Sequence, residues 1–305
     1  MTKKKKDLCI FLFFISIALL FIKHINIVIP SVIKSSNIFF YKVFPSLFLF
    51  FILIEFFISY DSLKFIVNIL YKPLNKLFKI SKSGIFVIIT SIVSGLPSNA
   101  KVIKSLLDRN EISISEANKV ILYTFFPNPM FVIGTIGIIL FNNKIIGIKL
   151  LFINYLVNFI IGLLIRNYPI VEKNLINKKN QNKFSSVLKT GINSSFDTLL
   201  LILGNITIFI TLSNILSIYL PFNSLFNNII LSILEMTSGI TSINEIDIIL
   251  KLKILIINAS LSFSGISVIL QASSILSDYE INIKKIIKFR ILSLILNLII
   301  SYFIF

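Results

Sequence analysis

Two stretches of this 305-residue chain resemble each other, and both interrupt apolar sequence with small and polar residues. The first is 91–95 (Ser-Ile-Val-Ser-Gly), and the second is 235–239 (Glu-Met-Thr-Ser-Gly). Each is followed by another apolar segment that breaks, at 126–129 and at 263–265. Such paired breaks are the best sequence indication of a transporter binding site. They free backbone amides and carbonyls at membrane depth, which is tolerated only where the backbone is buried in protein or lines a cavity.

Hydroxyl and amide side chains cluster at both breaks. Singly, each is most often a packing contact between helices, but the clustering favours a binding site. Half-helix N-termini at the breaks would attract an anionic group. Lys101 follows the first break and either draws in such a ligand or is a snorkelling lysine that sets topology. The predicted substrate-binding residues are Ser94, Gly95, Ser98, Asn99, Lys101, Asn128, Glu235, Thr237, Ser238, Gly239, Ser264, Gly265 and Gln271.

Other side chains near the breaks support specific hypotheses. Glu235 opens the second motif and is interpreted either as a proton or cation site or as a structural hydrogen-bond acceptor for hairpin backbone. Glu55, inside an apolar run, is either functional or a partner for a nearby lysine or hydroxyl. Four aromatic residues beside the breaks could stack on a flat ring. They are Tyr123, Phe125, Phe126 and Phe263.

The composition indicates that the bilayer is the solvent of this chain. It is 56% hydrophobic, with a mean hydropathy of +0.93. The net charge of +17 sits in short loops between apolar runs, which indicates membrane topology rather than a nucleic-acid partner. With one cysteine and one histidine, we expect no disulfide, no metal site and no cofactor. No nucleophile or phosphate-binding motif supports an enzyme.

Nine apolar segments are predicted. They are 8–22, 39–58, 85–98, 120–141, 145–165, 195–217, 227–243, 254–276 and 286–305. Segment 85–98 would cover only about 21 Å as a helix, against a hydrocarbon core of about 30 Å. We therefore interpret 85–98 and 227–243 as arms of re-entrant hairpins on opposite sides. That topology, with a cytoplasmic N-terminus, places 23 of the 30 basic residues in the cytoplasm, whereas nine simple spans would divide them equally.

The predicted fold is therefore an all-α integral membrane protein, a polytopic helical bundle with an inverted repeat and two re-entrant hairpins. Residues 1–38 would form an N-terminal transmembrane helix, uncleaved because no signal-peptidase site follows it. The repeats would span 39–166 and 187–305, joined by a basic cytoplasmic linker at 167–186. Two further segments lie outside this scheme. These are an interfacial helix at 63–80 and a solvated cytoplasmic helix pair at 101–119.

Five motifs in this order resemble the YlbJ-type sporulation integral membrane proteins, of the nucleoside-recognition or Gate-domain group. They are Val-Phe-Pro-Ser-Leu-Phe-Leu-Phe-Phe-Ile-Leu at 43–53, Ser-Gly-Leu-Pro-Ser-Asn-Ala-Lys at 94–101, Pro-Asn-Pro at 127–129, the motif at 235–239, and Ser-Phe-Ser-Gly-Ile-Ser-Val at 262–268. The resemblance covers most of the chain from residue 39 onward. It implies Gate-like repeats, a fold related to concentrative nucleoside transporters, and movement of dipicolinic acid across the outer forespore membrane during sporulation.

The leading functional hypothesis is thus a multi-pass transporter of a small organic anion, with dipicolinate as the expected substrate. The alternatives are a cation-coupled nucleoside carrier of the same fold and a structural membrane protein needed for spore assembly. The expected partners are the anionic substrate and the lipid bilayer; a coupling proton or cation and a homo-oligomer are left open. The expected location is a bacterial cell membrane, specifically the mother-cell or outer forespore membrane if the family role holds.

Overall fold

The computed structural model of the chain describes residues 3–60, 63–171, 183–219 and 224–305, and all regular structure within these ranges is helical. The elements are α1 (Lys3–Lys23), α2 (Ile25–Ile38), η1 (Phe39–Val43), α3 (Phe44–Ser59), α4 (Lys64–Phe78), α5 (Lys82–Ser94), α6 (Ser98–Asp108), α7 (Ile114–Ile121), η2 (Met130–Leu140), α8 (Lys144–Leu164), α9 (Phe184–Tyr219), α10 (Ser224–Leu234), α11 (Met236–Asn244), α12 (Leu250–Phe263), α13 (Gly265–Ile275) and α14 (Ile283–Ile304). The elements η1 and η2 are π-helices.

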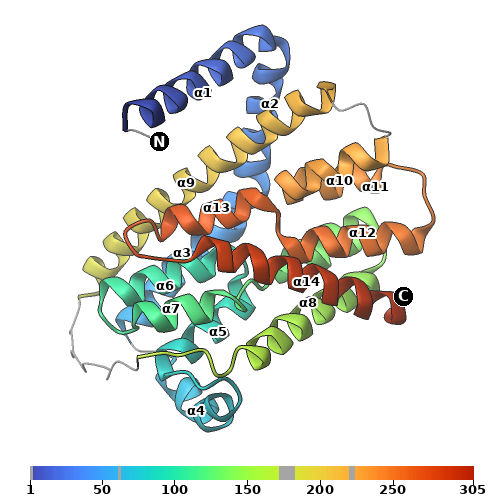
Figure 1. Cartoon of the computed structure of the whole chain (residues 1–305). Coiled ribbons are helices and arrows are strands. Elements are labelled where there is room, and N and C mark those ends of the chain that lie inside the picture. The colour runs from blue at the N-terminus through green and yellow to red at the C-terminus, as the bar shows by residue number, and fades with distance from the viewer. Residues whose placement is uncertain (1–2, 61–62, 172–182, 220–223) are drawn as a thin grey trace.

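The helices confirm the predicted class, an all-α integral membrane protein. Four spans are long and apolar enough to cross a bilayer, namely α8, α9, the α12–α13 pair and α14. Two bent pairs of helices, α1 with α2 and α4 with α5, would raise the number to six. Figure 1 shows α9 passing along one side of the molecule, with α8, α12 and α14 below it and α1 projecting from the top.

At the first predicted hairpin, α5 and α6 pack against each other as a helical hairpin. Helix α5 begins after Ser81, whose hydroxyl accepts a hydrogen bond from the Gly84 amide at 3.3 Å. It ends at Gly95, where φ is +74°, a backbone conformation that glycine adopts without steric cost. The break predicted at Gly95 is therefore a real end of a helix.

The second predicted hairpin is formed by α10 and α11, which also lie side by side in Figure 1. Glu235 separates the two helices. At Gly239 a Cβ atom would collide with the backbone of Ser232 on the facing helix, so only glycine permits this close approach.

Both helices predicted to break do so. In the first half, α7 ends at Ile121, and residues 122–129 separate it from η2. In the second half, Ser264 takes a left-handed conformation, with φ of +70°, between α12 and α13. Each break lies beside the hairpin of its own half: a Cβ atom on Gly95 would lie 2.5 Å from the Asn128 amide nitrogen, and one on Gly265 would lie 3.0 Å from the Met236 amide nitrogen.

The expected solvated helix pair at 101–119 is wrong, because α6 and α7 are largely buried. Glu116 and Lys119 are fully buried and Lys101 nearly so. The Lys119 ammonium donates to the carbonyls of Lys79 and Arg166 at 2.9 and 2.8 Å, which compensates its burial. The mixed charges resembled a solvent-exposed face in the sequence, but these three charged side chains are buried inside the protein.

The remaining peripheral segments follow the prediction only in part. Helix α4, predicted to be interfacial, is bent by 99° against α5 and keeps Lys72 and Lys76 exposed. Residues 1–38 form two helices rather than one, because the chain turns by 94° at His24. Of the linker predicted at 167–186, residues 172–182 lie outside the described residues.

Candidate functional site

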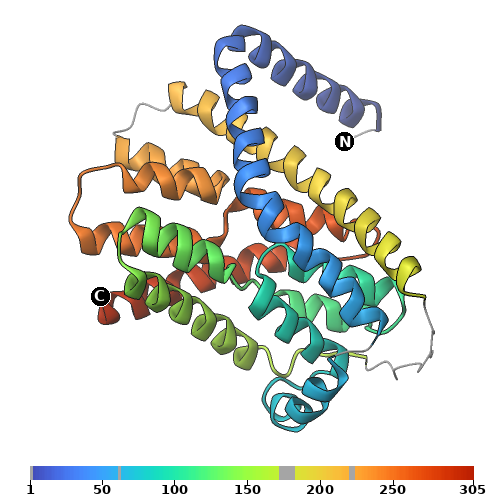
Figure 2. The ribbon, with the colours of Figure 1, turned by 180° about the vertical axis from the view of Figure 1, so that it is seen from behind.

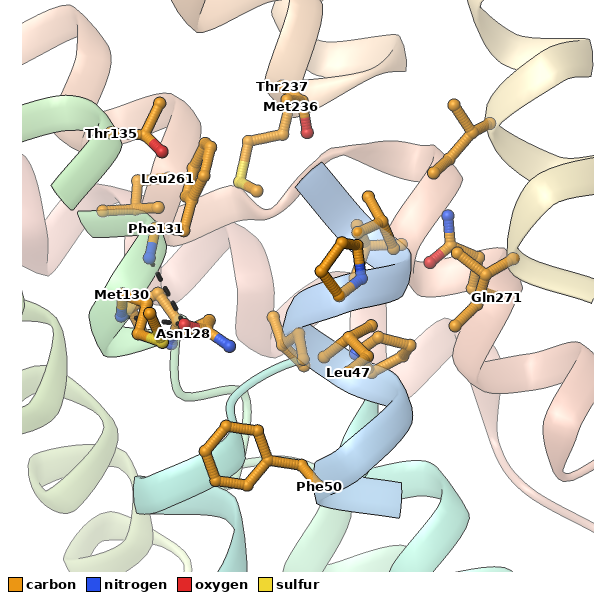
Figure 3. Close-up of a pocket in the computed structure, with 18 of the residues that line it drawn as sticks. Leu47, Phe50, Asn128, Met130, Phe131, Thr135, Met236, Thr237, Leu261 and Gln271 are labelled. Atoms are coloured by element: carbon orange, nitrogen blue, oxygen red, sulfur yellow. Dashed lines mark hydrogen bonds between the residues drawn. The ribbon is translucent and has the colours of Figure 1, made fainter. Parts of the chain in front are cut away.

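A cavity of about 760 Å³ lies between the two broken motifs (Figure 3). Its walls come from η1 and α3, from η2, from α9, from the tips of both hairpins and from α12 and α13. The lining residues are Tyr41, Val43, Pro45, Leu47, Leu49, Phe50, Leu53, Leu96, Pro97, Pro127, Asn128, Met130, Phe131, Thr135, Ile139, Leu140, Ile202, Ile206, Glu235, Met236, Thr237, Thr241, Leu261, Val268 and Gln271. The surface is mostly apolar, with a few polar groups, as is usual for small-molecule sites.

Asn128 organises the wall contributed by the first half. Its side-chain amide donates to the Ser94 carbonyl at 3.0 Å, and its side-chain oxygen accepts from the amides of Met130 and Phe131 at 2.8 and 3.3 Å. One side chain therefore satisfies a carbonyl at the end of α5 and caps the start of η2 (Figure 3). Both groups were freed by the breaks that the sequence predicts.

Glu235 organises the second half in a similar way. Its carboxylate accepts from the Thr237 and Ser238 amides at 3.1 and 2.7 Å and so caps α11. The side chain is only 2% exposed, yet it also contributes to the cavity wall. The structural interpretation of Glu235, a hydrogen bond to hairpin backbone, is confirmed.

These two caps correct one argument for an anionic ligand. The sequence suggested that free amides at half-helix N-termini would point into the site. The amides of Met130 and Phe131 are instead bonded to Asn128, and those of Thr237 and Ser238 to Glu235. An incoming anion would have to compete with these side chains.

Four of the predicted binding residues line the cavity: Asn128, Glu235, Thr237 and Gln271. In Figure 3, Asn128 and Gln271 lie on opposite sides of Leu47, and Thr237 comes from α11 above them. The others surround the hairpin tips and the second break without contributing to the wall. These are Ser94, Gly95, Ser98, Asn99, Lys101, Ser238, Gly239, Ser264 and Gly265.

Lys101 is neither snorkelling nor part of the cavity wall. It is 5% exposed, its ammonium donates to the Ser195 hydroxyl at 3.0 Å, and it lies 4.4 Å from the centre of the Phe51 ring. The lysine therefore ties α6 to α9 and α3 through a hydrogen bond and a cation–π contact.

The aromatic residues proposed to stack on a ligand are also elsewhere. Tyr123, Phe125, Phe126 and Phe263 are buried in the core, and none lines the cavity. The phenylalanines in the cavity wall are instead Phe50 and Phe131. The run of apolar residues around each of them carries no sequence signal that distinguishes a cavity wall from a core face.

Glu55 has a structural partner, as one of its two interpretations stated. Its partner is an arginine rather than a lysine: Glu55 forms an ion pair with Arg109, which lies at the C-terminal end of α6. Arg109 also donates a hydrogen bond to the Ser59 hydroxyl at 3.2 Å. The pair ties α6 to α3.

Sequence reasoning missed a buried polar network between α8, α12 and α14. Asn258 accepts from Asn154 at 2.6 Å and donates to Asn297 at 3.2 Å; Asn297 in turn donates to Ser262 at 2.7 Å. The signal was present as helical spacing. Asn154 and Asn158 are four residues apart on α8, and the polar positions of α14 recur every three or four residues at 290, 293, 297 and 301.

Arg290 ends this network and is fully buried. It donates to the Leu122 carbonyl at 2.9 Å and to the Asn158 side-chain oxygen at 3.0 Å, and its guanidinium lies 4.7 Å from the Phe125 ring centre. Asn158 itself donates to the Phe125 carbonyl at 3.2 Å. Arg290 and Asn158 thus satisfy two carbonyls that the break between α7 and η2 frees.

A second polar cluster joins loops predicted to be cytoplasmic. Lys104 pairs with Asp278, and Tyr279 donates to Asp108 at 2.6 Å, a hydrogen bond that raises the pKa of Tyr279 to about 12. The contacts bring α6 to the loop between α13 and α14. Within the described part of the chain, no group of three His, Cys, Asp or Glu side chains could hold a metal ion.

The fold and the cavity define a class: a polytopic helical membrane protein with a mostly apolar cavity between two broken motifs. The chain is 30% identical, over an alignment 289 residues long, to the sporulation integral membrane protein YlbJ of Bacillus subtilis (strain 168), covering 82% of this chain and 71% of that protein. It therefore belongs to the YlbJ family of sporulation integral membrane proteins, as its motifs indicated. No family model matches the chain. No solved structure matches it either.

Proposed function

We propose that the protein transports a small organic anion, dipicolinate, across the membrane that surrounds the forming spore. The observation that carries this proposal is the cavity of about 760 Å³ between the two broken motifs. Its size falls in the range of small-molecule sites, about 300–1,000 Å³. The relative from Bacillus subtilis is a sporulation integral membrane protein, which supports a role in spore formation.

The cavity wall suits a flat ring that carries polar substituents. Phe50 of α3 and Phe131 of η2 offer aromatic surface. Asn128, Thr237 and Gln271 offer hydrogen-bond donors at the edges. A planar aromatic dicarboxylate would use both kinds of contact.

The proposed ligand is an anion, and the wall of the described cavity contains the carboxylate of Glu235. Binding of the anion therefore has to involve a change at Glu235. While ionised, Glu235 occupies the Thr237 and Ser238 amides itself and repels an anion. Protonation removes its charge and weakens both hydrogen bonds. The amides at the start of α11 then become available to a substrate carboxylate, so uptake of the anion is coupled to uptake of a proton.

Access from alternate sides would come from an inverted repeat of 39–166 and 187–305. Each half contains a first apolar helix, a hairpin, a broken helix and a final helix. The two first helices, α3 with 16 residues and α9 with 36, pack on each other, and so do the two final helices, α8 and α14. Pairing of corresponding elements supports a two-fold relation between the halves, in which one hairpin opens to each side of the membrane.

One observation favours a nucleoside carrier of the same fold as the second candidate. The cavity wall contains Glu235 and, among the described residues, no Lys or Arg. A neutral ligand with a coupled cation would suit this wall, with the Glu235 carboxylate binding the cation.

Thermal unfolding of the purified protein separates the two candidates. Dipicolinate and uridine are added at the same concentration, and each stabilises only the folded state if it binds that state alone. We expect dipicolinate to raise the midpoint more than uridine, and more at low pH than at high pH. The opposite ranking supports the nucleoside carrier. No shift with either ligand contradicts both and favours a structural role in spore assembly.

A further inference from the structure

We propose that the cavity opens sideways into the bilayer and that an acyl chain of a membrane phospholipid occupies its mouth. The mouth lies between α3 and η2. Four apolar residues there both line the cavity and are between 45% and 73% exposed: Leu49 and Leu53 of α3, and Met130 and Ile139 of η2. Wall residues with this much exposure mark the rim of an opening rather than its interior.

The opening faces the side of the bundle. Figure 2 shows α3 and η2 on the near face, while α3, α8 and α9 run in broadly the same direction across the picture. Helices α8, α9 and α14 are long and apolar enough to span the bilayer, and all three run across the picture rather than toward the viewer, so the membrane normal lies close to the plane of the picture. The near face is therefore a lipid-facing side, and the rim meets hydrocarbon rather than water.

The distribution of polar groups in the cavity fits this orientation. The carboxylate of Glu235 and the amide of Gln271 belong to side chains that are 2% and 3% exposed, so the polar end is deep. The exposed end is mostly apolar, and Tyr41 is the exposed wall residue there that carries a hydroxyl. An apolar space does not retain water, whereas a lipid tail can enter it from the adjacent hydrocarbon.

An acyl chain in the mouth would close the side of the cavity and leave the polar end for a solute. This inference rests on the rim and its orientation and does not require the proposed transport. The cavity would then hold two ligands at once: a lipid acyl chain at its apolar mouth and a polar solute at its deep end.

The chain contains no tryptophan, so single-tryptophan variants report on one position each. In liposomes of phosphatidylcholine brominated on its acyl chains, we would compare three variants. Phe50→Trp reports from the cavity wall, Phe152→Trp from the exposed lipid face of α8, and Phe126→Trp from the fully buried core. We expect Phe50→Trp to lose fluorescence almost as strongly as Phe152→Trp, and far more than Phe126→Trp. Quenching of Phe50→Trp no greater than that of Phe126→Trp would overturn the proposal.

A second measurement uses the unaltered chain and so does not depend on the folding of variants. A phospholipid with a photoactivatable acyl chain is crosslinked in the bilayer, and the labelled peptides are mapped. Attachment to the rim at Leu49 or Met130 supports the proposal. Attachment confined to other lipid-facing helices contradicts it.

A third measurement uses the Leu49→Cys variant on a Cys9→Ser background. Crosslinking of this cysteine between two protein copies would overturn the proposal, because a second copy would then cover the mouth.

Discussion

The side-chain amide of Asn128 donates to the carbonyl of Ser94 at 3.0 Å, which fastens the broken helix of the first half to the tip of its hairpin. The same side chain caps η2, so three backbone groups freed by two different breaks depend on one residue. The candidate site is therefore held together by side chains that replace the hydrogen bonds a continuous helix would make.

Replacing Asn128 with alanine should destabilise the fold by about 1–3 kcal/mol, because the Ser94 carbonyl loses its bond and η2 loses its cap. Chemical or thermal unfolding in detergent measures the loss. The matched control is Asn205→Ala, since Asn205 is half-buried on α9 and its side-chain amide donates to the Leu201 carbonyl of its own helix at 2.8 Å. Equal stability of the two variants would show that Asn128 does not support the break.

Gly239→Ala tests the close approach within the second hairpin. The added methyl would collide with the backbone of Ser232, so α10 and α11 must separate, and we expect poor recovery of folded protein. Gly204→Ala on α9 is the control, because nothing lies within 4 Å of its Cβ position. Its stability should change by no more than about 0.5 kcal/mol. A Gly239→Ala protein as stable as this control would refute the packing described.

The membrane topology can be mapped by labelling single cysteines on a Cys9→Ser background. We expect 85–98 and 227–243 not to cross the membrane, and 101–119 and 167–189 to share the cytoplasmic side. Asn110→Cys and Lys178→Cys should therefore label from the cytoplasm, and Lys144→Cys from outside; position 178 lies outside the described residues. The contacts of α6 with the α13–α14 loop support this arrangement, because that loop precedes the basic residues at 284–290. Labelling of 110 and 178 only from outside would rule out the inverted repeat.

Glu235→Gln should reduce uptake with little loss of folded protein, because the glutamine oxygen can still accept one backbone hydrogen bond at the start of α11. If protonation of Glu235 frees those amides, wild-type uptake rises as pH falls, and the variant loses this dependence. Glu55→Gln is the control, since Glu55 pairs with Arg109 and lies outside the wall. An unchanged rate and pH profile in Glu235→Gln would remove this residue from the mechanism.

The sequence predicted the breaks at Gly95 and Gly265 well because both glycines act locally, at positive φ values that glycine adopts without steric cost. It predicted the role of Lys101 poorly, because that role depends on Ser195, 94 residues away. The buried network of α14 could have been predicted from its spacing, whereas the choice of Phe50 and Phe131 for the cavity wall could not. Which apolar face lines a space and which fills the core is decided by packing between distant helices.

Uptake of labelled dipicolinate into proteoliposomes tests the central claim most directly. Wild-type protein should accumulate dipicolinate in preference to uridine, with faster uptake when the outside is acidic. Glu235→Gln should lose the pH effect while Glu55→Gln retains it. Uptake of uridine but not dipicolinate, or no uptake of either by protein that is folded and inserted, would contradict the account.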